Sequence, residues 1–98
     1  MYSIEDLFRL VHLDGAEKLT LYPGTPPVMM LDGEPHMIEG PDLTPEDVEE
    51  LLRSIADTRL RRELRELGSV QFIYRFRGAT DFVVHAKIEN QIVGIDIH

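Results

Sequence analysis

The sequence VQFIYRFRGATDFVVHAKIENQIVGIDI, residues 70–97, decides the fold of this chain. It contains three runs rich in β-branched and aromatic residues, separated by short pairs of turn-forming residues. The runs are Val70 to Phe76, Asp81 to Ile88 and Gln91 to Ile97, with turns at Arg77-Gly78 and Glu89-Asn90. This pattern predicts a meander of three antiparallel strands.

The middle run indicates which side of this sheet is buried. Its residues alternate between apolar and polar, so that Phe82, Val84 and Ala86 point to one face of the strand. His85 and Lys87 point to the opposite face. An antiparallel sheet with this alternation is covered on one side only. We therefore expect helices from elsewhere in the chain to pack on the apolar face.

Two amphipathic helices are predicted immediately before the meander. Thr44 can cap the first helix, and Pro45 suits its first helical position. Apolar residues recur at helical spacing over residues 48–55 and again over residues 60–67. Gly68 then ends the second helix, because glycine readily adopts the left-handed conformation of a helix C-terminus.

The first third of the chain predicts one helix and three strands. Ser3 can cap a helix that stops at Asp14-Gly15, and the alternation from Glu17 to Tyr22 is typical of a strand. A loop with three prolines follows, at Pro23, Pro26 and Pro27, because proline cannot donate to a strand ladder. Residues 28–38 then form a hairpin around Asp32-Gly33.

Together these elements predict a single α+β domain over residues 1–98. It has a mostly antiparallel sheet of about six strands, with about three helices packed on one face. The chain has 98 residues, of which 43% are hydrophobic, and this is enough for one core. It contains no cysteine, which excludes disulfides, zinc–thiolate sites and thiol nucleophiles.

The charge of the chain argues against binding to nucleic acid or to anionic lipid. The net charge is −8, whereas both of those partners require Lys and Arg to neutralise phosphate. The charges are also unevenly distributed: eight of the 18 acids lie between Asp32 and Glu50, and seven of the ten bases lie between Arg53 and Arg77. Such segregation is suited to docking on a protein partner. Solvated helix faces are the plainer interpretation.

The sequence predicts no membrane insertion and a cytoplasmic location. Its apolar runs are far shorter than the roughly 20 residues that a spanning helix needs. The N-terminal residues include acids and lack the layout of a signal peptide.

No catalytic, metal or cofactor site is predicted. The histidines are isolated from one another and form no HxH or HxxxH pair. No serine has a nearby histidine and aspartate that would activate it as a nucleophile. The four histidines are His12, His36, His85 and His98.

Five residues are predicted to bind a protein partner: Arg61, Arg62, Arg65, Asp81 and His85. The three arginines lie on the second predicted amphipathic helix, and arginine is enriched at protein interfaces. The spacing also allows an ion pair within this helix between Arg62 and a glutamate one turn later. The last strand is expected at a sheet edge, where a second copy of the chain could add to it as a homodimer.

Four segments of the sequence follow one another in a known order: Gly15 to Leu21, Pro26 to Glu34, Leu43 to Leu52 and Gly78 to His85. Together they resemble the N-terminal domain of the PilT/GspE family of type IV pilus and type II secretion ATPases. The resemblance covers nearly the whole chain and implies a PAS-like fold, a sheet with helices packed on it. In that family a RecA-like ATPase domain follows. No GxxxxGK[ST] phosphate loop occurs in these 98 residues, so we do not expect ATP hydrolysis.

The resemblance fails at the residues that face nucleotide in the family. Two arginines of the family correspond here to Asp81 and Val83, the following Asn to His85, and a strand histidine to Thr20. An acid at a position facing phosphate repels it. We therefore interpret the chain as a non-catalytic adaptor or regulatory module linked to pilus or secretion ATPases, with such an ATPase as a candidate partner. A PAS-like small-molecule sensor and an N-terminal fragment of a complete ATPase remain alternatives.

Overall fold

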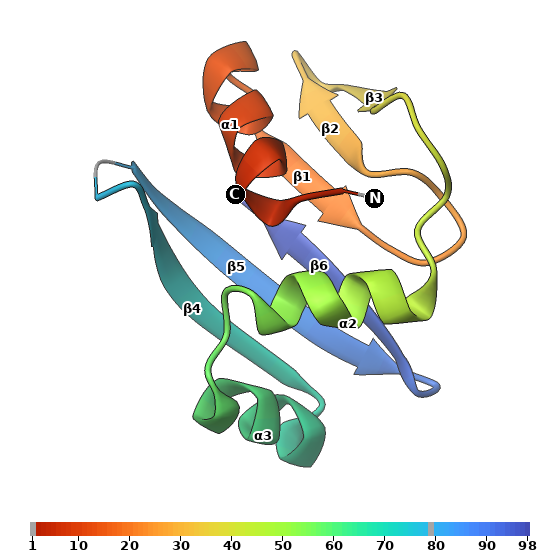
Figure 1. Cartoon of the computed structure of the whole chain (residues 1–98), viewed down its shortest axis with the longest axis vertical. Coiled ribbons are helices and arrows are strands. Elements are labelled where there is room, and N and C mark those ends of the chain that lie inside the picture. Colours follow the sequence, from red (N-terminus) through yellow and green to blue (C-terminus); the bar gives the residue numbers. More distant parts are fainter. Residues whose placement is uncertain (1, 79) are drawn as a thin grey trace.

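The computed structural model describes residues 2–78 and 80–98. These residues form a six-stranded antiparallel sheet in the order β3-β2-β1-β6-β5-β4, together with three helices (Figure 1). The predicted α+β class is therefore confirmed, and the PAS-like label describes it only loosely. The elements are α1 (Ile4–Asp14), β1 (Lys18–Leu21), β2 (Val28–Leu31), β3 (Glu34–Met37), α2 (Pro45–Arg53), α3 (Thr58–Leu67), β4 (Ser69–Phe76), β5 (Thr80–Glu89) and β6 (Ile92–Ile97).

The helix boundaries follow from local capping. Ser3 caps α1, and Thr44 caps α2 in a reciprocal capping box in which its hydroxyl accepts from the Asp47 N–H at 3.0 Å. The Asp57 carboxylate accepts from the Leu60 N–H at 2.8 Å at the start of α3. Left-handed glycines end α1 and α3, as predicted, because their N–H groups can then bond to the last helical carbonyls.

Two-residue turns connect β2 to β3 and β5 to β6. Asp32 and Gly33 have φ angles of 50° and 79°, and Asn90 and Gln91 have φ angles of 52° and 67°. Arg77 and Gly78 are also left-handed. Paired positive φ angles match the right-handed twist of the strands that they join. The turn between β5 and β6 is at Asn90-Gln91, one residue later than the predicted turn at Glu89-Asn90.

The prediction that the last strand lies at a sheet edge is wrong. β6 lies in the middle of the sheet between β1 and β5, and its C-terminal half pairs with β1 at Leu19↔Ile97 and Leu21↔Ile95. The physical reason is burial, since alternate residues of β6 are apolar and need cover from both neighbours. Val93, Ile95 and Ile97 are all buried. The edge strands are β3 and β4.

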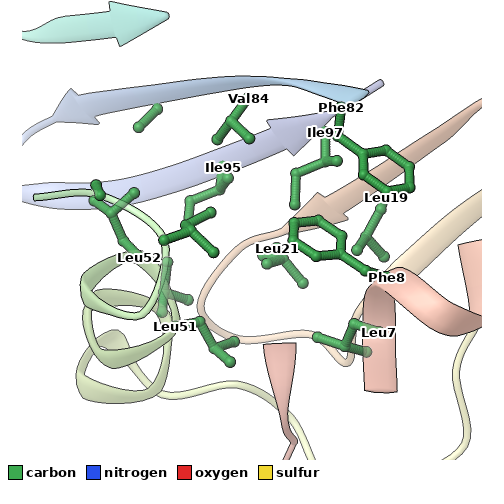
Figure 2. Packing of buried hydrophobic residues seen from close by; sticks show 14 of the residues in the cluster. Leu7, Phe8, Leu19, Leu21, Leu51, Leu52, Phe82, Val84, Ile95 and Ile97 are labelled. Atoms are coloured by element: carbon green, nitrogen blue, oxygen red, sulfur yellow. The ribbon is translucent and has the colours of Figure 1, made fainter. Parts of the chain in front are cut away.

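The core lies between the sheet and the three helices. The ring of Phe8 from α1 stacks on Phe82 with a centroid distance of 4.8 Å and on Tyr74 at 5.2 Å. Figure 2 shows Phe8 beside Phe82 and Leu19, while Leu51 and Leu52 of α2 occupy the region near Ile95. This packing confirms the prediction that helices cover one face of the sheet. Within residues 2–78 and 80–98, no helix combines the length and the hydrophobicity needed to cross a bilayer.

Candidate functional site

The face of the sheet opposite the helices is open. Thr20 of β1, Asp96 of β6 and His85 of β5 all point to this face, because they alternate with buried residues along their strands. The register places Thr20 opposite Asp96, and Asp96 opposite His85. These three side chains therefore form a row across the three central strands.

A hollow of about 320 Å³ lies on this open face, and we call it the sheet hollow. Its base is at Gly94, against which the ring of Tyr22 lies. A Cβ atom on residue 94 would be only 2.9 Å from Cδ1 of Tyr22, so a side chain there would push the ring away. Tyr22 keeps 46% of its surface exposed. The hollow is lined by Thr20, Tyr22, His85, Lys87, Glu89, Ile92, Gly94, Ile95 and Asp96.

The charged groups around the sheet hollow are largely paired with one another. The Thr20 hydroxyl donates to Asp96 Oδ1 at 2.9 Å, and Lys18 Nζ lies 3.8 Å from the same oxygen. Lys87 Nζ contacts Glu89 Oε1 at 2.9 Å, and this hydrogen bond and charge raise the pKa of Lys87. Exposed pairs of this kind add little stability. They leave a polar rim of both signs around an aromatic ring, an arrangement typical of protein interfaces.

Asp81 lies on the open face at the far end of β5. It accepts a hydrogen bond from Arg75 Nε at 3.0 Å, and this bond raises the pKa of Arg75. Asp81 lies four positions before His85 along the strand, which is about 13 Å at 3.3 Å per residue. Asp81 is therefore outside the sheet hollow, while His85 lines it.

The arginines of α3 are distributed over more than one surface. Arg65 Nη2 lies 3.7 Å from Glu49 Oε1 of α2, and Arg61 Nη2 donates to Thr58 Oγ1 at 3.3 Å. Arg61 Nε is buried and has no hydrogen-bond partner among the described residues. The pair expected between Arg62 and the glutamate that follows is not among the ion pairs of the described residues, whereas Arg59 pairs with Glu63 at 3.8 Å.

A narrow groove of about 50 Å³ separates α2 and α3 near the ends of β5 and β6, and we call it the arginine groove. It contains Arg61 and Arg65 but not Arg62, which lies on the outer side of α3 beside Arg59. The five predicted partner-binding residues are thus split over four places. The groove is lined by Glu49, Leu52, Arg53, Arg61, Leu64, Arg65, Ile88 and Val93.

The sequence did not identify Gly94 or Asp96 as parts of a site. The alternation of β1 indicated that Thr20 lies on a polar face, and His85 was recognised in the same way on β5. The pairing of β1 with β6 joins residues 76 positions apart, as in the bond between Thr20 and Asp96. No local pattern reports such a pairing. Within the described part of the chain, no three His, Asp or Glu side chains are grouped as metal ligands.

No family model matches this chain. Two curated proteins of Pseudomonas aeruginosa are similar to it. The type IV pilus retraction ATPase PilT is 29% identical over 92 residues, which cover 94% of this chain and 27% of PilT. The type IV pilus ATPase PilU is 29% identical over 93 residues, which cover 95% of this chain and 24% of PilU. The chain therefore spans about a quarter of the length of these relatives.

Solved structures show the same fold. The crystal structure of the pilus retraction motor PilT with bound ADP matches with a TM-score of 0.90 and 27% identity, over 100% of this chain and 29% of that chain. The ATPase DotB of Legionella pneumophila matches with a TM-score of 0.78 and 17% identity, over 99% of this chain and 29% of that chain. The second likeness concerns the fold alone.

Proposed function

Because this chain is homologous to the N-terminal region of the type IV pilus ATPases PilT and PilU, we propose that it is a non-catalytic docking module. Its partner is an ATPase of the pilus or secretion type, and its place of action is the cytoplasm. The observation that carries this proposal is the open sheet face with the sheet hollow at its centre.

The chemistry of the open face supports protein docking. Tyr22 offers a rigid ring that can be buried at low cost in conformational entropy, and aromatic residues are enriched among residues that dominate interfaces. His85, Lys87 and Asp96 surround it with donors and acceptors. A partner with a complementary rim and one apolar side chain can fill the hollow beside the Tyr22 ring.

The same face is poorly suited to a nucleotide. Lys87 is already paired with Glu89, and Asp81 is an acid that pairs with Arg75. Carboxylates oppose phosphate, and the chain carries a net charge of −8. These features favour an adaptor or regulatory role over nucleotide binding.

The arginines of α3 supply a second contact in this proposal. Arg61 and Arg65 lie at the arginine groove, and Arg62 lies on the outer side of α3. On an acidic chain, these bases can provide electrostatic complementarity that accelerates association and fixes orientation. Asp81 and His85 contact the partner from the open face. Because these contacts lie on different sides of the sheet, the partner must wrap around the β5–β6 end or offer two surfaces.

The proposal can be tested by calorimetry, which measures binding of the purified chain to a purified PilT-type ATPase from the organism that encodes the chain. We expect Tyr22→Ala combined with His85→Ala to weaken binding at least tenfold, or about 1.4 kcal/mol. His36→Ala is the control, since this histidine lies on the exposed edge strand β3 away from the hollow. ATP turnover by the partner, measured with and without the module, separates a regulator from an adaptor.

Two results would contradict the proposal. One is the absence of binding to the ATPase at high micromolar concentration. The other is ATP hydrolysis by the purified 98-residue chain alone. Tight binding of ATP to the sheet hollow, lost in Tyr22→Ala, would instead support a small-molecule sensor.

A further inference from the structure

The two edges of the sheet differ in how well they are protected against pairing with another strand. β3 has four residues, and one of them, Pro35, has no N–H to donate. β4 has eight residues, Ser69–Phe76, without proline or glycine, and it is rich in aromatic and β-branched residues. A long, regular and partly apolar edge of this kind is a template for a further strand.

The hydrogen-bond pattern identifies which groups of β4 are free. The N–H of Ile88 on β5 donates to Gly68 O, which precedes β4, at 2.9 Å, whereas Val83 on β5 exchanges two bonds with His98, at 3.0 and 2.9 Å. Along an antiparallel strand, the backbone groups of successive residues point alternately to the two neighbouring strands. Since Val83 bonds toward β6 and Ile88 toward β4, the odd-numbered residues of β5 bond to the β6 side and the even-numbered residues bond to β4. Their partners on β4 are also even-numbered.

From residue 71 onward, the odd-numbered residues of β4 therefore direct their N–H and C=O groups away from the sheet. These are Gln71, Ile73 and Arg75. Within residues 2–78 and 80–98, none of their backbone groups takes part in the turn, loop or side-chain hydrogen bonds. Ile73 also keeps 68% of its surface exposed on the open face.

We propose that β4 pairs with β4 of a second copy of this chain, antiparallel and centred on Ile73. The pairing joins the two six-stranded sheets into one continuous sheet. It uses the six free N–H and C=O groups of Gln71, Ile73 and Arg75 on each copy. This inference is independent of the proposed docking function, because the edge lies beside the open face and leaves the sheet hollow uncovered.

The side chains of β4 are self-complementary in this register. On the open face the two Ile73 side chains lie opposite each other, and each also neighbours Val83, its partner on β5. Gln71 lies opposite Arg75 of the second copy, so no two like charges are paired directly.

On the face that carries the helices, Phe72 lies opposite Tyr74 of the second copy, and Tyr74 opposite Phe72. Both rings are only partly buried in the single chain. Aromatic pairs across strands are favourable, so each face of the joined sheets gains an apolar contact. In a register shifted by two residues, Ile73 would lie opposite Arg75 of the second copy, and the pairing of Ile73 with Ile73 would be lost.

Amide hydrogen exchange of the intact chain, followed by NMR over about a hundredfold range of concentration, tests the pairing directly. We expect the amides of Gln71, Ile73 and Arg75 to exchange rapidly at low concentration and at least about tenfold more slowly at high concentration. The amides of Phe72 and Tyr74 are bonded within the chain and stay protected throughout. Equal and rapid exchange of the three outward amides at every concentration would overturn the proposal.

Sedimentation equilibrium of two variants provides the second measurement. Ile73→Lys places two like charges opposite each other and is expected to lower the association constant at least tenfold. Met37→Lys is the matched control, because Met37 is 69% exposed and lies on the other edge strand. Circular dichroism checks that both variants fold. A dimer that survives Ile73→Lys, or that Met37→Lys also dissociates, contradicts the β4 pairing.

Discussion

The two faces of the sheet are built from the same strands but differ in what their aromatic residues do. Phe8 is fully buried against the helix-covered face, where it contacts Tyr74, Phe76 and Phe82. Tyr22 lies on the open face against Gly94 and stays 46% exposed. The first ring lies at the centre of the aromatic packing in the core, whereas about half of the surface of Tyr22 remains accessible. The covered face holds the buried core, whereas the open face is the one that we propose for docking.

Truncation of one ring on each face gives the largest expected difference. Phe8→Ala should lower the free energy of unfolding by about 3–5 kcal/mol, since it leaves a cavity among packed aromatic rings. Tyr22→Ala should lower it by less than about 1 kcal/mol, because an exposed ring loses little transfer energy. Urea denaturation measures both values. Similar losses for the two variants would mean that the open face is part of the stabilising core.

A side chain at position 94 sharpens the comparison on the open face. Gly94→Val should cost about 1–3 kcal/mol, because the Cβ atom would lie 2.9 Å from the Tyr22 ring and force it to move. The same variant should weaken partner binding more than it weakens folding. Gly78→Val is not a suitable control, because Gly78 has a positive φ. The double variant Gly94→Val/Tyr22→Ala is a better control. It should recover the stability that Gly94→Val loses, because the ring that clashes with the new side chain is absent.

Loss of one hydrogen bond from the polar row on the open face should have a smaller effect on stability than a side chain at position 94. Thr20→Val removes the hydrogen bond to Asp96 at 2.9 Å and is expected to cost about 0.5–1.5 kcal/mol. Thermal unfolding at low and high salt measures the change. If the loss is strongly salt dependent, the contribution comes from the charge of Lys18 near Asp96 and not from the hydroxyl.

The smallest expected effect is a pH dependence on the helix side of the molecule. The Tyr2 hydroxyl donates to Pro41 O at 2.6 Å, and burial, followed by the charges of Asp42 and Asp47, raises the pKa of Tyr2. A raised pKa in the folded state favours the protonated form, so this contribution is full below about pH 10 and is lost as the pH rises through the folded value. Tyr2→Phe should remove that alkaline decline. An unchanged alkaline profile in Tyr2→Phe would assign the decline to other groups.

Much of the fold followed from local sequence. Ser3, Thr44 and Gly68 marked helix ends, and Asp32-Gly33 marked a hairpin, because capping and left-handed turns depend on a few neighbouring residues. The alternation in β5 also predicted the covered and open faces. The position of β6 was predicted incorrectly, because its partner β1 is distant in the sequence.

The candidate site was predicted only in part for the same reason. His85 was placed on the open face by alternation and Asp81 was singled out by the family resemblance, but their neighbours on that face come from other strands. Tyr22 was assigned to a loop, and nothing near it in the sequence indicated that its ring lies against Gly94. The arginines of α3 were recognised as a group, whereas their division between the arginine groove and the outer side of the helix depends on the packing of α3 against α2.

The sequence by itself therefore determined the elements, their ends and the apolar side of each, since these depend on side-chain chemistry within a few residues. Only the tertiary structure decided which strands are neighbours, which edge is free and which side chains meet across the open face. Pairing energies between strands are similar for many partners, and burial of the whole core is what selects one arrangement. The row of Thr20, Asp96 and His85 exists because that selection placed β6 between β1 and β5.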